Sequence, residues 1–421
     1  MRLFLTALLL LPALRSPAQM TMNMGGPASS MTENILRHEG SGTSLEPGST
    51  SPPMVMKMTR SQWMLMLHGS VFVVEQQQTG PRGRDKLFSA NWVMPMAQRS
   101  YESGQLTLRT MLSLEAATIS GRYYPELFQQ GETAFGRPIV DGQHPHNLFM
   151  EIAGIYDQRL GRRGLFTLYA APVGDPALGP IAYPHRASAA EDPLAPLSHH
   201  LQDSTHIAYD VLSGGAAVNL GRCGVRLEAS GFHGREPDEN RWHLEVGALD
   251  SWSGRLSVAA GRDWLGQYSV GHLQSPEALH AQENVLRQTA SLHYHHAWGS
   301  TGLDAAAIWG RNHTIATADH SNGYLLEATL SLAAKQAVWT RIENADRTTD
   351  LLAAAAPSEE TVLGRVQAYT GGYAHRVAHW SSGAAELGAQ FTGYDTPSTA
   401  IALYGEHPWG VAALFKVRLG N

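Results

Sequence analysis

The sequence has little cysteine, no long apolar run and no excess of either charge. Cys223 is the only cysteine among 421 residues, so no disulfide can form within the chain. No run of about eighteen apolar residues follows the N-terminal stretch, which argues against a helical inner-membrane protein. With 31 Lys and Arg against 37 Asp and Glu, the net charge of −6 is too balanced to indicate a nucleic-acid-binding protein.

Catalytic motifs are equally scarce. The chain contains no P-loop, no dinucleotide-binding fingerprint, no C-x-x-C pair and no H-E-x-x-H motif. Ser198-His199 and Ser204-x-His206 supply the residue types of a barrel lipid hydrolase, but two residue types do not establish a nucleophile geometry. We therefore do not expect an enzyme.

A regular alternation of short and long links is what the sequence does contain. Short links fall near Arg99–Gln105, Leu160–Gly164, Leu220–Cys223, Gly261–Gly266, Trp298–Thr301, Ala334–Gln336 and Arg376–His379. Long links fall near Gln77–Leu87, Ala117–Asn147, Pro172–Ser204, Arg235–Ser251, Ser275–Arg287, Asn312–Ser321, Ala345–Val362 and Gly393–Trp409. Outer-membrane barrels have short periplasmic turns, long outer loops and an even strand count. The chain is therefore predicted to be all-β, a transmembrane antiparallel β-barrel of about sixteen strands, as in porins.

Polarity alternates along the expected strands. At residues 105–116, for example, Leu106, Leu108 and Leu112 share one face and Arg109 lies on the other. Apolar residues should face lipid, because Arg or Lys there costs about 2–4 kcal/mol at the midplane. Parity places the following charged residues on the lumen side: Arg109, Glu115, Glu151, Asp157, Asp210, Arg226, Glu228, Arg255, Glu327, Arg341, Glu343, Arg365, Glu386, Lys416 and Arg418. Their mixed signs predict salt bridges, which for most of them would only stiffen and hydrate the wall.

The sequence divides into three expected segments. Residues 1–18 have the basic, apolar and small-residue regions of a signal peptide, with cleavage expected after Ala18. Residues 19–60 are rich in Met, Gly, Ser, Thr and Pro and are expected to form a flexible periplasmic segment. Residues 61–421 are expected to form the barrel.

Methionines give the first candidate site. Met20, Met22 and Met24 lie in a polar, glycine-rich stretch, where packing in a core does not explain them. Thioethers are soft ligands that suit Cu(I) and Ag(I), so this stretch is a candidate metal site or else an unordered tail. Met64 and Met66 fit one face of a strand, for which we favour packing.

Histidines give the second candidate site, since the chain has 20 of them. Two expected outer loops and their flanks carry the candidate ligands His144, His146, His199, His200, Asp203 and His206. Imidazole and carboxylate together suit Cu(II), Zn(II) or Ni(II). The alternative, which we favour from sequence, is that these residues hold the long loops together through hydrogen bonds.

Several stretches resemble a known group of proteins. They are Trp63–Phe72, Asp141–Phe149, Gly174–Arg186, His199–His206, Gly234–Glu239 and Ser275–Glu277. Together they resemble a porin-like family of bacterial outer-membrane β-barrel proteins with Met-rich N-termini, whose members look like companions of copper or heavy-metal efflux systems. The resemblance implies a barrel fold and a link to copper or silver. It implies no catalytic residue.

The sequence thus predicts a porin-like channel or transport protein in the outer membrane of a Gram-negative bacterium. Its expected partners are outer-membrane lipids and a small solute or metal ion, with copper or silver as the candidate ion. Porins of this size often form homotrimers, and no residue pattern decides the oligomeric state. A lipid-modifying enzyme and a structural or adhesive barrel are the alternatives.

Overall fold

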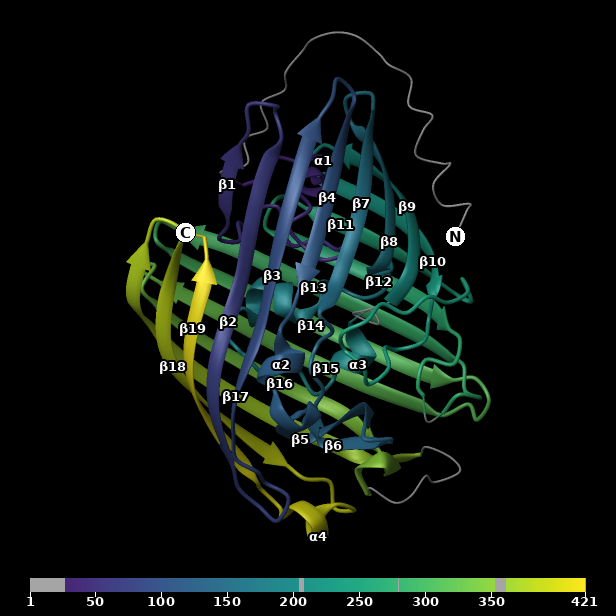
Figure 1. The fold of residues 1–421 in the computed structure, drawn as a ribbon, viewed down its shortest axis with the longest axis vertical. Helices are drawn as coiled ribbons and strands as arrows, with labels where there is room; N and C mark the ends of the chain where they lie inside the picture. The colour runs from purple at the N-terminus through teal and green to yellow at the C-terminus, as the bar shows by residue number, and fades with distance from the viewer. Residues whose placement is uncertain (1–26, 204–207, 279, 353–360, 421) are drawn as a thin grey trace.

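Sixteen antiparallel strands form one closed barrel in the computed structural model, which describes residues 27–203, 208–278, 280–352 and 361–420 (Figure 1). The barrel strands are β2 (Met64–Gln78), β3 (Lys86–Ser100), β4 (Gly104–Leu112), β7 (Phe149–Leu160), β8 (Gly164–Gly174), β9 (Ala208–Leu220), β10 (Cys223–His233), β11 (Ser251–Ala260), β12 (Trp264–Leu273), β13 (Val285–Trp298), β14 (Thr301–Thr314), β15 (His320–Leu332), β16 (Gln336–Thr348), β17 (Val362–Trp380), β18 (Gly383–Asp395) and β19 (Trp409–Leu419). Pairing of β19 with β2 closes the ring, and the short β1 (Val55–Met58) pairs with the start of β2. No helix in these ranges is long and apolar enough to span a membrane. The predicted fold class is confirmed.

Turns of two or three residues join the strands at one end of the barrel, and longer loops join them at the other. The predicted link at Arg376–His379 is wrong, because β17 continues to Trp380 and its turn is formed by residues 381–382. A register shift between Arg376 and Ala378 interrupts the pairing of β17 with β18 at this point. An irregularity of this kind breaks the two-residue period, which made the interior of a strand look like its end.

Two of the long loops carry most of the structure outside the barrel strands. The β4–β7 loop (113–148) contains α2 (Glu115–Thr118), η1 (Ser120–Arg122) and a separate hairpin of β5 (Tyr124–Ala134) and β6 (Arg137–Gln143). The β8–β9 loop (175–207) contains η2 (Tyr183–His185), η3 (Ala187–Ala189) and α3 (His199–Gln202). The remaining helices are α1 (Met31–Arg37), η4 (Thr349–Leu352) and α4 (Ile401–Tyr404).

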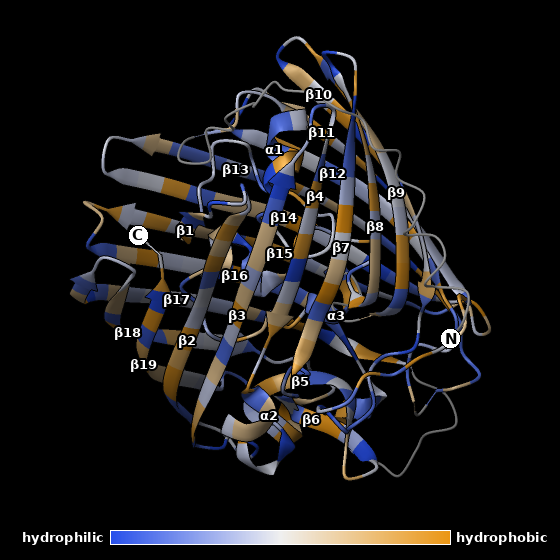
Figure 2. Ribbon diagram, turned by 45° about the horizontal axis from the view of Figure 1, so that its top comes forward, coloured by the Kyte–Doolittle hydropathy of each residue, from blue (hydrophilic) through white to orange (hydrophobic). Residues whose placement is uncertain are grey.

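The barrel wall is apolar outside and polar inside. In β16, Val338 and Ile342 are exposed, whereas Arg341 and Glu343 are buried. Figure 2 shows hydrophobic and hydrophilic residues following one another along the strands. An apolar outer surface combined with short turns at one end and long loops at the other is the architecture of an outer-membrane barrel. The protein is therefore located in the outer membrane of a Gram-negative bacterium.

Residues 27–54 fold into the barrel, which corrects the expectation of a flexible segment for this part of 19–60. In α1, the buried Met31, Ile35 and Leu36 pack against Leu165 and Leu265 of the wall. Ser30 caps the helix by accepting a hydrogen bond from the Glu33 N–H. Because α1 has only 7 residues, its apolar stripe is too short to be visible as a helical period in the sequence. We refer to residues 27–54 as the N-terminal segment.

Candidate functional site: the barrel interior

Arg109 anchors the N-terminal segment to the wall. Its Nε and Nη2 atoms lie 2.7 Å from the two carboxylate oxygens of Glu151. The same guanidinium donates to the carbonyl oxygens of His38 at 2.8 Å, Gly40 at 2.6 Å and Gly42 at 2.5 Å. Because this ion pair is buried, the carbonyl oxygens of the segment supply the acceptors for the Arg109 donors that Glu151 does not use.

Most residues that parity assigned to the lumen are buried. The buried ones are Arg109, Glu115, Glu151, Asp157, Arg226, Glu228, Arg255, Glu327, Arg341, Glu343, Glu386 and Lys416. Arg418 is partly buried beside Glu386. Glu115 belongs to α2 of the β4–β7 loop and not to a strand.

Two of the lumen predictions need correction. Arg365 is exposed and pairs with Asp346, while the next residue, Val366, is buried. A register shift in the pairing of β16 with β17 lies just before this position. The alternation of inward and outward residues, followed from the start of the strand, therefore predicted the wrong face for Arg365. Asp210 has a positive φ of 51° at the start of β9, and its carboxylate accepts the N–H of Gly247. It therefore holds an outer loop.

The inward charges bind folded loops and do not line an open pore. Arg186 of the β8–β9 loop pairs with Glu327 of β15 at 2.6 Å and with Asp203 at 3.2 Å. Arg341 of β16 pairs with Asp192 of the same loop at 3.0 Å. Asp203, a candidate metal ligand from sequence, is thus committed to an internal ion pair.

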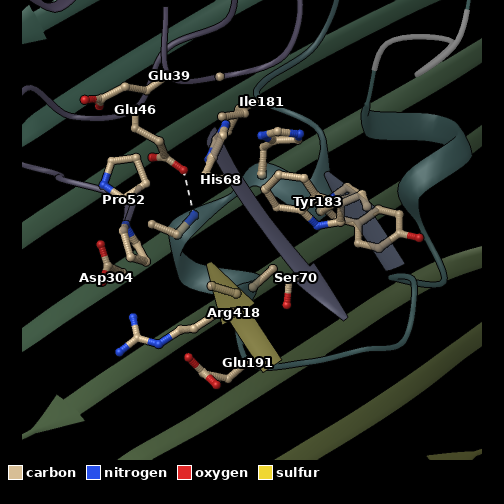
Figure 3. A pocket seen from close by; sticks show the side chains of 18 of the residues that line it. Glu39, Glu46, Pro52, His68, Ser70, Ile181, Tyr183, Glu191, Asp304 and Arg418 are labelled. Atoms are coloured by element: carbon tan, nitrogen blue, oxygen red, sulfur yellow. Dashed lines mark hydrogen bonds between the residues drawn. The ribbon is translucent and has the colours of Figure 1, made fainter. Parts of the chain in front are cut away.

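A cavity of about 340 Å³ remains inside the barrel, between the N-terminal segment, the β8–β9 loop and the wall. Figure 3 shows side chains from all three parts converging on it, with His68, Tyr183, Glu46 and Arg418 among them. Glu46 accepts the N–H of Ala187 at 2.8 Å, which joins the segment to the loop along one side of the cavity. The cavity has a mixed lining of charged, aromatic and aliphatic groups.

A row of methionine and histidine side chains lies beside this cavity. His68 of β2 pairs in register with Met94 of β3. Met94 in turn lies opposite Met111 of β4, because Val93 pairs with Leu112 and Met96 with Arg109. His185 of the β8–β9 loop places Nε2 3.0 Å from Sδ of Met111. The cluster around this row contains the buried Met66, Met94, Met96, Met111 and Met150.

This row of methionine and histidine side chains was not predicted from the sequence. The spacing of Met64-x-Met66-x-His68 and of Met94-x-Met96 puts each set on one face of a strand, and this was the available signal. Packing was the simpler interpretation for each strand alone. Only the register between strands brings His68, Met94 and Met111 together.

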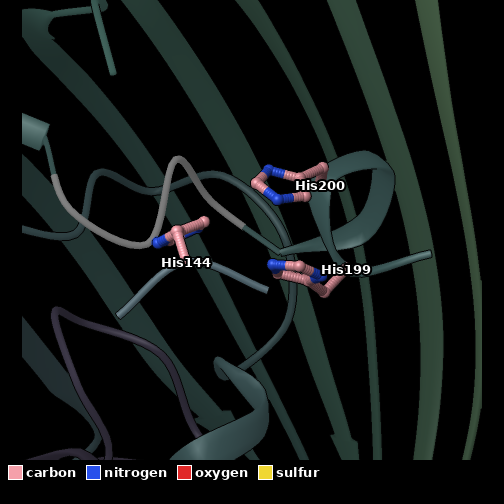
Figure 4. Close-up of side chains that lie close together, drawn as sticks. All are labelled: His144, His199 and His200. Atoms are coloured by element: carbon pink, nitrogen blue, oxygen red, sulfur yellow. The ribbon is translucent and has the colours of Figure 1, made fainter. Parts of the chain in front are cut away.

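His144, His199 and His200 form a second cluster, where the β4–β7 and β8–β9 loops meet (Figure 4). One ring nitrogen from each lies within 4.8 Å of the others. His146 lies further off, with its ring centroid 6.3 Å from that of His144, and its Nδ1 lies 2.8 Å from Oε2 of Glu115. The predicted loop histidines are thus partly brought together and partly separated.

Burial and neighbouring charges together shift the pKa of three polar loop groups. Burial lowers the pKa of His144, against the opposing effect of Glu132. Burial alone would raise the pKa of Glu132, but Arg241 and His144 hold it well below its usual range. Burial, together with Glu151, raises the pKa of Asp175 to about 7, against Ser41 and Arg109, which lower it.

Four predicted metal ligands lie outside the described residues. They are Met20, Met22, Met24 and His206. The soft-metal interpretation of the first three stays a prediction.

Known proteins resemble the chain only in architecture. No protein-family model matches it, and no curated protein matches it. The structure is similar to an anion-selective porin from Comamonas acidovorans, with a TM-score of 0.48 and 11% identity over 85% of this chain and 100% of the porin. For OmpF of Salmonella typhi in complex with daunomycin, the TM-score is 0.48 with 8% identity over 84% of this chain and 97% of that one. For OmpT of Vibrio cholerae, the TM-score is 0.44 with 9% identity over 86% of this chain and 100% of that one.

Proposed function

We propose that the protein is an outer-membrane channel for small solutes that is closed in the observed conformation. The observation that carries this proposal is the cavity of about 340 Å³ inside a closed barrel, bounded on one side by an N-terminal segment that hydrogen bonds and apolar contacts hold against the wall. Irregular backbone inside a membrane barrel is tolerated where it is buried in protein or lines water. Displacement of the N-terminal segment would join the cavity to the periplasmic end.

Hydrogen bonds and a small apolar cluster hold the N-terminal segment. In addition to the hydrogen bonds from Arg109, Arg226 donates to the carbonyl of Thr43 at 2.7 Å, and Asn219 donates to Oγ1 of Thr32 at 2.7 Å. These groups can be solvated when the segment leaves, so opening does not require the barrel to unfold. A homotrimer, expected for a porin of this size, stays a prediction.

Planar-bilayer recordings test the channel. Deleting residues 27–52 should raise the conductance. A disulfide between Thr32→Cys and Asn219→Cys, in a Cys223→Ser background, should hold the channel closed until a reductant is added. The Cys223→Ser chain alone is the matched control. If neither the deletion variant nor the reduced double-cysteine variant conducts, the channel proposal is refuted and a structural barrel is favoured. Turnover of lipid would instead favour an enzyme.

The methionine row favours a soft monovalent ion, Cu(I) or Ag(I), as one solute of this channel. Thioether and imidazole are the ligands that such ions prefer. His68 and His185 both line the cavity, and the Trp92 ring lies 4.2 Å from that of His185. A soft ion in the cavity could therefore contact the imidazoles of His68 and His185. None of the buried methionines of the row is among the residues that line the cavity, so contact with a thioether would require a side chain to move.

Replacing Met94 and Met111 by leucine keeps their size and removes their sulfur. We expect the double variant to bind Ag(I) more weakly than the wild type in folded, detergent-solubilised protein. Met58→Leu in the exposed part of β1 is the matched control. Equal Ag(I) binding by both variants would contradict the soft-ion assignment and leave the channel proposal standing.

A further inference from the structure

We propose that His144, His199 and His200 bind one divalent transition-metal ion, of the class that prefers imidazole, at the junction of the two large loops. This site is independent of the channel proposal and differs from the methionine row in ligand type and in position. Imidazole suits Zn²⁺, Cu²⁺ and Ni²⁺, whereas Mg²⁺ and Ca²⁺ prefer oxygen ligands.

The geometry of the three rings supports a shared ion. Their ligand nitrogens all lie within 4.8 Å of one another. Around a tetrahedral Zn²⁺ with Zn–N distances of about 2.0 Å, two nitrogens lie about 3.3 Å apart. Small side-chain rotations therefore suffice to bring three nitrogens to one ion. The ring centroids of His199 and His200 are already only 3.9 Å apart.

Hydrogen bonds to backbone carbonyls orient two of the rings. Nδ1 of His199 lies 2.9 Å from the carbonyl oxygen of Pro196, which can only accept a hydrogen bond. Nδ1 of His144 lies 3.1 Å from the carbonyl oxygen of Pro145. In a neutral His199 ring the contact with Pro196 places the proton on Nδ1. Nε2 of His144 faces the Glu132 carboxylate, so without an ion that nitrogen carries a proton, and a bound ion takes the place of this proton. Metal-bound histidines are typically oriented in this way.

The surroundings of the rings also suit a cation. Oε1 of Glu132, whose other oxygen pairs with Arg241, lies 3.0 Å from Nε2 of His144 and places a carboxylate oxygen beside the cluster. Gly131 has a positive φ of 119°, and a Cβ at this position would lie 2.9 Å from Nε2 of His200. The chain thus has a glycine where a side chain would displace the third ring.

An acidic cavity of about 70 Å³ lies among the outer loops beside His200. His200 forms part of its lining, and the carboxylates in the lining are Glu236, Glu277, Glu283, Asp346 and Asp350. Glu277, His280 and Asp350 also bring their ligand atoms within 4.8 Å of one another. Negative groups along a narrow approach raise the local concentration of cations. The cavity therefore gives a divalent ion an approach to His200, the member of the cluster that lines it.

Metal titration of the full-length chain tests the site. The protein is folded in detergent, stripped with EDTA and titrated with Zn²⁺, and a parallel sample receives Co²⁺, whose absorption spectrum reports tetrahedral coordination. We expect one tightly held Zn²⁺ per chain, a tetrahedral Co²⁺ spectrum and no displacement by excess Mg²⁺. A folded wild-type chain that holds no Zn²⁺ would overturn the proposal.

Substitutions locate the ion. His199→Gln and His200→Gln should each weaken Zn²⁺ binding by roughly 100-fold or more, because each removes a direct ligand. His200 is the more exposed of the two, so His200→Gln keeps the test decisive if the other variant fails to fold. The control is His407→Gln, an exposed outer-loop histidine beside Asp395 and Glu406. Unchanged binding in His200→Gln, or an equal loss in His407→Gln, would overturn the assignment.

Discussion

Replacing Arg109 by methionine should release the N-terminal segment without unfolding the barrel. The guanidinium donates to three carbonyl oxygens of the segment and to both oxygens of Glu151. In the variant, the three carbonyls lose their donor and the Glu151 carboxylate is buried without its guanidinium. Opening of the segment lets water reach all of these groups, so the substitution shifts the equilibrium toward the open state.

The size of the shift follows from the lost bonds. At about 1 kcal/mol net for each of the three carbonyl hydrogen bonds, docking of the segment weakens by about 3 kcal/mol. The true weakening should be larger than this value, because burying the unpaired Glu151 carboxylate costs further free energy in the closed state alone. At 1.36 kcal/mol per factor of ten, the open population rises roughly 100-fold.

Trypsin cleavage after Arg37 measures that population. The Arg37 side chain is only 1% exposed in the closed protein, so cleavage there reports opening when opening and closing are fast. Arg162→Met, in an exposed turn, is the control. Adding Glu151→Gln to Arg109→Met removes the unpaired charge and should recover part of the protection. A wild-type cleavage rate in folded Arg109→Met protein would refute the reasoning.

Three further predictions concern pH, a loop glycine and the methionines of residues 20–24. Burial favours protonated Asp175 in the folded protein, so its stabilising effect is full below about pH 4 and is lost as the pH rises to about 7. Asp175→Asn should therefore flatten the pH dependence of urea unfolding across that range, and an unchanged slope would contradict this. Gly131→Ala should weaken Zn²⁺ binding by displacing His200, whereas Gly136→Ala, where φ is also positive at 68° but no atom lies within 4 Å of an added Cβ, should not. Replacing the methionines of residues 20–24 by leucine in the full chain should reduce the number of Ag(I) ions bound, and equal numbers would remove that site.

Local patterns determined the barrel. The two-residue period of polarity and the alternation of short and long links are both properties of neighbouring residues, so the sequence alone predicted the strand number and the face of most inward charges. Irregularities in strand pairing are where these local patterns gave wrong predictions. The register shifts near Arg347 and Arg376 change the parity without any distinct residue signal, which explains the wrong face for Arg365 and the misplaced turn.

Only the tertiary structure decided what fills the barrel. A loop that covers the mouth and a loop that folds into the lumen have similar compositions, so the sequence could name loop histidines but not show which ones meet. His144 and His199 come from different loops, and His68, Met94 and Met111 from different strands. Their meeting depends on strand register and on ion pairs such as Arg186 with Glu327, which join residues distant in the chain. Such contacts leave no local period in a single sequence, and for this reason the sequence determined the wall of this protein and the tertiary structure determined its interior.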